Sequence, residues 1–377
     1  MAALSIATLL SWGVLYYSLP VLSPRVSEET GWSPALLAGV YSATLVGAAL
    51  AGAALGKVFD HAGDLRKVMP WFSSLGAAGM ALSTTGSLPA FITGWVFVGI
   101  AQAGTLWGPA FIAITRWFNA GDSAKPMMVI TAVGGSAALL FAPLTANIAN
   151  LYGWRTATII LAAGYLTLSL PVQFFGLRTP WQIPEHERVV TRADIHAITF
   201  QRRFLILQFC MLVAGTALFG VTLSLMQIAV ERGASYIEAS FIFGLVGLGQ
   251  VLGRVGMTLI PLPHNPTSRL RILMISAACA LAILAIAPVV LPLAIMAALA
   301  GALRGWHTLM MRSGVTERWG TTHFGAVMGR FNFPVAIGIA LSPVIGVGLA
   351  GLTGGYVWAV LAVAVALGGC AMLVSRT

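Results

Sequence analysis

The chain has 377 residues, of which 58% are hydrophobic and only 8% are charged. Soluble domains carry about 25% charged residues, so this composition excludes a soluble globular protein and is typical of a polytopic membrane protein. The formal net charge of +10 would suggest a nucleic-acid partner in a soluble protein. Here we expect it to reflect cytoplasmic loops, so no nucleic-acid partner is expected.

Apolar runs separated by short polar loops predict an all-α membrane protein with twelve transmembrane helices. The first run begins almost at the N-terminus, and we interpret it as a retained span rather than a cleaved signal peptide. In chain order the expected spans are residues 2–22, 34–56, 68–86, 89–115, 127–150, 157–177, 204–230, 238–260, 271–288, 291–312, 324–348 and 353–374.

The longest polar stretch lies between the sixth and seventh spans, at residues 178–203. Because it separates six apolar runs from six others, it predicts a linker between two halves. The expected organisation is an N-terminal six-helix half at 1–177, a cytoplasmic linker at 178–203 and a C-terminal six-helix half at 204–377.

Lysine and arginine are distributed unevenly over the two sides of this topology. The side with both termini and the linker receives Lys57, Arg66, Lys67, Arg116, Lys125, Arg178, Arg188, Arg192, Arg202, Arg203, Arg269, Arg271, Arg318 and Arg376, with Arg312 and Arg330 at span ends. The opposite side receives only Arg25, Arg155 and Arg232. By the positive-inside rule, both termini are expected in the cytoplasm.

The two halves resemble each other at a shift of 202 residues. This shift aligns Gly31 with Gly233, Ser33 with Ser235, Gly47 with Gly249, Lys67 with Arg269, Gly99 with Gly301, Arg116-Trp117 with Arg318-Trp319, and Gly153 with Gly355. A rival local shift of 197 aligns Gly47, Gly52 and Gly56 with Gly244, Gly249 and Gly253. We prefer the single shift because it needs no gaps. Duplicated six-helix halves are typical of secondary transporters, whose site lies at the interface between the halves.

The loop after the second span reads GKVFDHAGDLRK. It resembles the signature loop of the major facilitator superfamily through Gly56, Asp60, Gly63, Arg66 and Lys67. This resemblance implies a gating role, in which Asp60 and the basic residues latch the cytoplasmic side while the protein faces outward. His61 and Asp64 depart from the family pattern, which would weaken the latch or make it pH-sensitive. The alternative is an ordinary tight loop after a helix.

Four further segments extend the resemblance over nearly the whole chain: GWSPALLAGVYSATLVGAALAG, WGPAFIAITRWF, FAPLTANIANLYGWRTA and GLGQVLGR. They are similar to bacterial permeases of the monocarboxylate-transporter-like branch. Members of that branch often read Tyr-Glu-Pro-Ala-Phe where this chain has Trp107 to Phe111. The missing acid puts proton coupling through this position in doubt.

Arg304 follows fifteen uncharged residues, Val289 to Leu303. At about 1.5 Å rise per residue it would lie roughly 20 Å into the tenth span, inside a hydrocarbon core about 30 Å thick. A charge at this depth faces a bundle interior or a water cavity and is a functional candidate. The alternative is a structural arginine that caps helix carbonyls.

Arg254 follows fourteen uncharged residues in the eighth span. Both spans run inward, so we expect the two arginines to converge at one depth. Gln250 lies four residues earlier on the same helix face. In the branch that this chain resembles, the corresponding position is often acidic and the arginine is implicated in anion binding and gating. The alternative is packing against carbonyls at the inner mouth.

His307 shares a helix face with Arg304, being three residues later. It is a candidate for carrying a coupled proton or, equally, a neutral hydrogen-bonding partner. No aspartate or glutamate lies deep in any expected span. Two buried cations without buried anions favour a small organic anion as substrate, because arginine forks suit carboxylates.

The resemblance implies that the first, fourth, seventh and tenth helices line the cavity. It adds substrate-binding candidates from the first, fourth and eleventh spans: Trp12, Tyr16, Tyr17, Gln102, Trp107 and Asn332, with Phe331 and Phe333 beside Asn332. For the aromatic residues, packing or lipid contact is the stronger alternative.

The sequence thus predicts a secondary active transporter of the bacterial inner membrane that moves a small, monocarboxylate-like anion by alternating access, with proton coupling or by exchange. We expect no cofactor, no metal site and a monomer. An efflux permease for a drug or amphipathic metabolite is the nearest alternative. A membrane receptor is disfavoured because no signalling domain is attached, and an enzyme because no catalytic constellation can be assembled.

Overall fold

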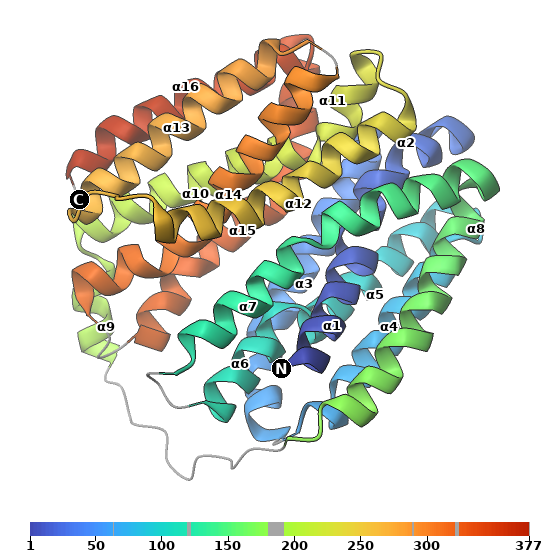
Figure 1. Ribbon diagram of the computed structural model, residues 1–377, viewed down its shortest axis with the longest axis horizontal. Coiled ribbons are helices and arrows are strands. Elements are labelled where there is room, and N and C mark those ends of the chain that lie inside the picture. Colours follow the sequence, from blue (N-terminus) through green and yellow to red (C-terminus); the bar gives the residue numbers. More distant parts are fainter. Residues whose placement is uncertain (63, 119–121, 180–191, 289, 321–323, 377) are drawn as a thin grey trace. The chain divides into compact units, whose positions relative to one another are not determined.

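A computed structural model describes residues 1–62, 64–118, 122–179, 192–288, 290–320 and 324–376. The secondary structure of these residues is helical, with no strand among them. The chain divides into two compact units, Met1–Glu185 and His186–Thr377. The predicted all-helical membrane fold is confirmed (Figure 1).

Helices of the first unit carry the labels of Figure 1. They are α1 Ala2–Ser11, η1 Trp12–Tyr16, α2 Ser18–Thr30, α3 Pro34–Ala62, η2 Leu65–Lys67, α4 Met69–Ser83, α5 Leu88–Thr105, α6 Trp107–Trp117, α7 Ala124–Gly135 and α8 Ala137–Gly176.

The second unit begins with a short helix inside the expected linker. Its helices are α9 Arg192–Thr199, α10 Arg202–Leu223, α11 Leu225–Glu231, α12 Tyr236–Leu259, α13 Pro266–Ile286, α14 Leu291–Trp319, α15 Phe324–Thr353, α16 Tyr356–Leu373 and η3 Val374–Arg376.

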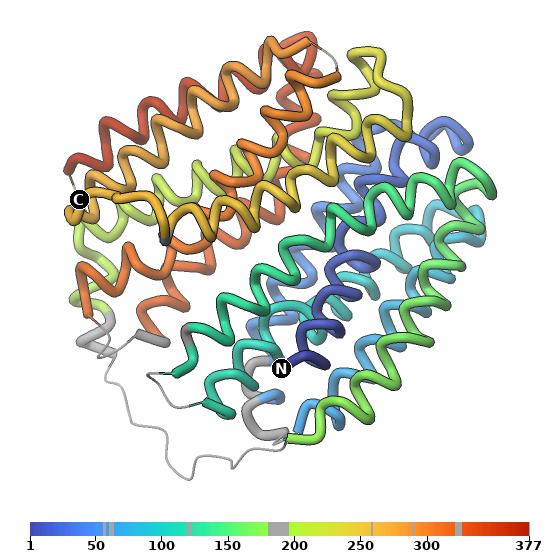
Figure 2. Tube along the Cα trace, viewed as in Figure 1, coloured from blue at the N-terminus to red at the C-terminus, as the bar shows by residue number. Residues whose placement is uncertain are grey.

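Ten stretches of the described chain are long and apolar enough to cross a membrane. One of them, Lys125–Gly176, has 52 residues and contains two crossings, because Gly153 at φ 78° interrupts the helix. Figure 2 follows this chain reversal through α7 and α8. The apolar helix α4, with 15 residues, is the twelfth crossing and packs against α5 and α8.

Corresponding glycines make the same close helix contact in each unit. A Cβ added to Gly99 on α5 would overlap the carbonyl oxygen of Thr44 on α3, and one added to Gly301 on α14 would overlap that of Val246 on α12. Both members of each contact are related by the 202-residue shift. The internal repeat predicted from sequence is therefore also a repeat of helix packing, and it supports the single shift over the rival one.

Two turns follow the same repeat. Gly31 ends α2 at φ 72°, and Gly233 precedes α12 at φ 90°; this left-handed backbone favours glycine. Ser235 then starts α12 with a capping box, because its hydroxyl accepts from the Glu238 N–H and the Glu238 carboxylate accepts from the Ser235 N–H. These local signals fix where α12 begins, and thereby the height of its buried arginine.

Candidate functional site

Arg304 is buried in the second unit, with 2% of its surface exposed. Its guanidinium carbon lies 3.7 Å from the ring centroid of Phe219, and Nη1 donates to the Thr222 hydroxyl at 3.1 Å. Both partners belong to α10. The charge of α14 is thus held against the face of the seventh span by a cation–π contact and one hydrogen bond to a neutral hydroxyl.

These contacts leave Arg304 incompletely satisfied. Its Nε is buried and has no hydrogen-bond partner among the described residues. No aspartate or glutamate is among the buried residues described in the second unit. Since buried charges in proteins are normally paired, this guanidinium can accept an anionic ligand without displacing an existing ion pair.

His307 lies one turn further along α14 and is fully buried. Its Nε2 is 2.9 Å from the carbonyl oxygen of Met211 on α10. A carbonyl only accepts, so Nε2 carries the hydrogen in this contact. Nδ1 has no hydrogen-bond partner among the described residues. The geometry therefore matches a neutral imidazole, and Nδ1 is the atom where a proton would add.

Arg254 and Gln250 are both buried on α12, with 5% and 4% of their surfaces exposed. Close backbone contacts join α12 to α14 near both buried arginines. Gly305 packs on the Gln250 backbone, and the Trp306 indole donates to the Gly253 carbonyl at 2.6 Å.

On the same interface Gly253 packs on the backbone of Ala302 and Gly249 on that of Ala298, so Arg304 and Arg254 lie on neighbouring stretches of two closely packed helices. The expectation that the two arginines converge at one depth stays a prediction.

Gln102 is a buried polar residue of α5, with 1% of its surface exposed. Its Nε2 donates to the Leu15 carbonyl at 2.8 Å, while Oε1 has no hydrogen-bond partner in the described chain. Leu15 belongs to η1, a π-helical turn in the first span. Tyr41 donates to the next carbonyl, that of Tyr16, at 2.8 Å. The widened turn thus exposes two carbonyls that side chains of α3 and α5 satisfy.

Aromatic rings gather around this π-turn. The ring of Trp12 lies 4.6 Å from that of Tyr16 and 5.0 Å from that of Trp107. Tyr16 in turn makes an edge contact with Tyr17, at 4.9 Å. The predicted candidates Trp12, Tyr16, Tyr17 and Trp107 therefore form one aromatic cluster in the first unit, with Gln102 bonded to the same turn.

The fourth span, predicted as one helix over 89–115, is broken at Leu106 (φ −87°, ψ −134°). The cause is Pro109. It has no N–H to donate to the Thr105 carbonyl, and its ring clashes with that group. The corresponding residue of the second unit is Met311, and α14 continues through it. The break lets α6 begin at Trp107 and brings that indole to the aromatic cluster.

Residues of the eleventh span have separate surroundings. Phe331 is fully buried and packs on Phe204 at 5.5 Å, so it is a core residue. Phe333 is 50% exposed. The Oδ1 atom of Asn332 is buried without a hydrogen-bond partner in the described chain, which keeps Asn332 a candidate for ligand binding.

The predicted gating loop is described in part. Gly63 lies outside the described part of the chain, and so do the surroundings of Gly56 and the side chain of Asp60. Lys67 is exposed in η2, and the Arg66 guanidinium pairs with Asp64 at 2.6 Å. Burial raises the pKa of Asp64, but hydrogen bonds and charge from Arg66 outweigh it and hold that pKa below its usual value. Asp64 thus neutralises one basic residue of the loop.

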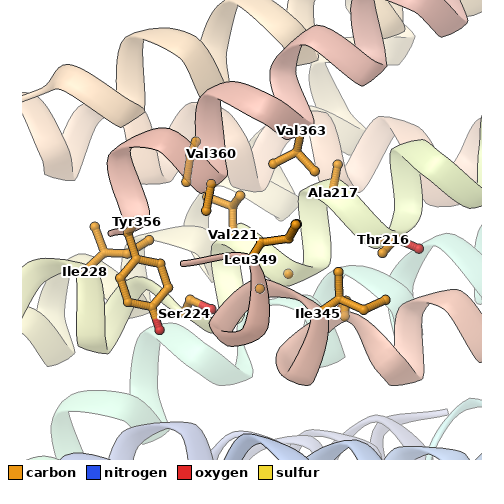
Figure 3. A pocket seen from close by; sticks show the side chains of 14 residues that line it. Thr216, Ala217, Val221, Ser224, Ile228, Ile345, Leu349, Tyr356, Val360 and Val363 are labelled. Carbon is orange, nitrogen blue, oxygen red and sulfur yellow. The ribbon is translucent and has the colours of Figure 1, made fainter. Parts of the chain in front are cut away.

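A separate cavity of about 30 Å³ lies within the second unit and is lined by neither arginine. Figure 3 shows Thr216 of α10, Ser224 just after α10, Ile345 and Leu349 of α15, and Tyr356 of α16 around it. Its lining is mainly aliphatic. The face of α10 that binds Arg304 is therefore distinct from the face that borders this cavity.

The described residues contain no group of three or more histidine, cysteine, aspartate or glutamate side chains placed to hold a metal. Sequence reasoning missed Phe219, Thr222, Met211 and Tyr41, which hold the candidate residues in place. Thr222 could have been found from the sequence, because a hydroxyl inside an apolar run needs a hydrogen-bond partner in a membrane.

A family model described as Major Facilitator Superfamily matches residues 4–311. No curated protein matches the chain at a significant level. The crystal structure of the nucleoside transporter NupG is similar with a TM-score of 0.79 and 16% identity, over 100% of this chain and 98% of that one.

Two crystal structures of a bacterial homolog of the human lysosomal transporter Spinster, both inward-facing, are similar as well. The unoccupied form has a TM-score of 0.72 and 15% identity, over 99% of this chain and 95% of that one. The occupied form has a TM-score of 0.73 and 15% identity, over 100% and 96%. At such identities the similarity shows a shared fold.

Proposed function

The chain belongs to the Major Facilitator Superfamily and is a membrane transporter; from this premise we propose that its substrate is a small organic anion. Transport would proceed by alternating access of a secondary active transporter. The choice of an anionic substrate rests on the buried charge of the second unit rather than on the fold, because one fold hosts many substrates.

One observation carries the proposal: Arg304 is buried with a cation–π contact and one hydroxyl partner, and its Nε is left without an acceptor. A charged side chain at the bilayer centre costs about 2.5–3.5 kcal/mol on insertion scales. A carboxylate would supply two acceptor oxygens in the geometry of the guanidinium fork. Substrate binding would thereby neutralise the charge.

We assign the remaining candidates by their surroundings. Arg254, with Gln250 one turn before it, would give the anion a second basic contact on the neighbouring helix α12. His307 would position Arg304 and α10. Gln102, Trp12, Tyr16, Tyr17 and Trp107 would form the apolar and hydrogen-bonding surface that the first unit offers, and Asn332 would add an amide from α15.

The finer assignment is a permease of the monocarboxylate-transporter-like branch in a bacterial inner membrane, with cytoplasmic termini, acting as a monomer. Gly108 stands where an acid is frequent in that branch. Coupling would therefore be either proton symport through another group or exchange of anions.

The test is thermal stabilisation of purified protein by a panel of carboxylates, cations and neutral compounds. A ligand that binds the folded state raises the unfolding temperature. We expect a carboxylate to stabilise the wild type. Because a hydrogen bond to a charged group contributes about 1.5–3 kcal/mol, Arg304→Gln should weaken its binding by roughly 10- to 150-fold.

Arg312→Gln is the matched control, since it removes the same charge from an exposed position on α14. It should bind like the wild type, and Arg304→Lys should recover part of the affinity by restoring charge without the fork. Equal stabilisation of wild type and Arg304→Gln by every ligand would show that Arg304 is structural and overturn the proposal.

The aromatic cluster of the first unit favours a second candidate, an efflux permease for an amphipathic metabolite or drug. Rings that lie 4.6–5.0 Å apart provide large apolar contacts for such a compound. In that case neutral aromatic compounds would stabilise the protein, Trp12→Ala would abolish the effect, and Arg304→Gln would not.

A further inference from the structure

A polar pocket of about 420 Å³ opens at one end of the second unit, away from the buried arginines. It is lined by Gln201, Arg203, Pro266, Thr267, Arg318 and Trp319. These residues come from the start of α10, the start of α13 and the end of α14. We propose that this pocket binds the phosphate headgroup of an anionic phospholipid.

Two guanidinium groups give the pocket its charge. Arg203 is exposed and forms no ion pair with any described residue. Arg318 is held across the pocket, because its Nη2 donates to the Thr267 hydroxyl at 3.0 Å. The nearest acid in sequence, Glu317, pairs with Arg269 at 2.6 Å. No carboxylate lines the pocket, so an entering phosphate would meet two cations and the Thr267 hydroxyl.

An indole closes the pocket and places it at the level of a membrane surface. Trp319 donates to Gln201 Oε1 at 2.9 Å and packs edge-on against Phe204 at 5.2 Å. It is the last residue of α14, one of the membrane-crossing helices. Tryptophan and arginine at span ends mark the headgroup region, and basic pockets between spans suit anionic headgroups.

The choice of a lipid over a soluble phosphate rests on the apolar residues beside the pocket. Phe200 is 68% exposed and Leu205 is 46% exposed, and they flank Gln201 and Arg203 in the chain. A lipid with its phosphate in the pocket could lay its acyl chains along such side chains. A soluble phosphate compound would leave them without an apolar partner.

Native mass spectrometry of the full chain tests this proposal by titration with phosphatidylglycerol and phosphatidylcholine of the same acyl chains. We expect one phosphatidylglycerol to bind more tightly than phosphatidylcholine. A basic residue near an anionic surface contributes about 1 kcal/mol, so Arg203→Gln should weaken that binding about five-fold. The double variant with Arg318→Gln should weaken it about 25-fold.

Arg202→Gln is the matched control, because Arg202 is exposed, carries the same charge and does not line the pocket. Equal weakening by Arg202→Gln would show that only diffuse charge attracts the lipid. Equal binding of the two lipids, or displacement of phosphatidylglycerol by inorganic phosphate, would also overturn the proposal. Arg203 makes no described ion pair, so Arg203→Gln tests the site even if Arg318→Gln fails to fold.

Discussion

Arg304 and His307 show how two polar side chains on one helix face differ in their surroundings. Arg304 contacts a ring and a hydroxyl, whereas His307 donates to a backbone carbonyl of the same neighbouring helix, α10. Protonation of His307 would add an N–H at Nδ1 and a second charge on this helix face. No acceptor for that N–H is described. We therefore expect His307 to act as a neutral donor that holds α14 on α10.

Replacement of His307 separates this role from proton carriage. The amide of His307→Gln can still donate toward Met211 but does not titrate, so substrate binding and its pH profile should be retained. His307→Leu removes the donor and should lower stability by about 1 kcal/mol. Both are measured by thermal unfolding and by carboxylate binding between acidic and neutral pH. A flattened pH profile in His307→Gln would instead identify His307 as the proton carrier.

At the scale of elements, closely packed glycines set the distance between helices. A Cβ at Gly301 or at Gly99 would overlap a carbonyl oxygen of the neighbouring span, whereas Gly52 has nothing within 4 Å and Gly256 only Ile260, at 3.7 Å. Small residues of this kind allow helix backbones to approach in lipid, where no hydrophobic effect drives them together. The same contact in both units explains why the sequence repeat persists at these positions.

Alanine substitutions test this packing. Gly301→Ala and Gly99→Ala should each lower the free energy of unfolding by about 1–3 kcal/mol, because overpacking displaces a helix backbone. Gly256→Ala and Gly52→Ala should be neutral or stabilising, since alanine is the better helix former. Urea or thermal unfolding in detergent measures the difference. Similar stabilities for all four variants would show that α3–α5 and α12–α14 adjust to a methyl group.

The sequence predicts helices well where the length of an apolar run and glycine turns set their ends. It predicts them less well where backbone hydrogen bonding changes the helix itself. The twelve crossings and the repeat follow from the sequence. The break at Leu106 had a signal in Pro109, four residues after Thr105. The π-turn at Trp12–Tyr16 had none, because it depends on donors from Gln102 and Tyr41 that lie far away in the chain.

For the whole molecule, the few basic residues on the side predicted to be outside have local partners. Arg25 bonds Glu28 at 2.9 Å and Asn150 at 2.8 Å, and Arg155 pairs with Glu29. Arg232 donates to the carbonyls of Leu284, Ala285 and Ala287 at 2.8–2.9 Å, at the end of α13. These residues stabilise loops and helix ends, so they do not weaken the orientation that the other basic residues predict.

The Arg232 contacts predict a stability effect at this end of the molecule. Arg232→Gln removes a charged donor from three carbonyls at a helix C-terminus, where a cation is favoured, and should lower the free energy of unfolding by about 2 kcal/mol. Arg271→Gln, an exposed position on α13, is the matched control. Thermal unfolding measures both, and an unchanged stability of Arg232→Gln would show that water replaces these bonds.

The orientation itself can be tested with a membrane-impermeant maleimide in intact cells. Cys210 and Cys370 are buried and Cys279 is exposed, so Cys279→Ser gives the background. His264→Cys and Thr85→Cys place one exposed thiol in a loop on each predicted side. With most lysine and arginine residues in the cytoplasm, Thr85→Cys should react in intact cells and His264→Cys only after permeabilisation. The reverse pattern would invert the predicted topology and place the proposed lipid pocket on the outer face. The basic residues would then not face the anionic cytoplasmic leaflet.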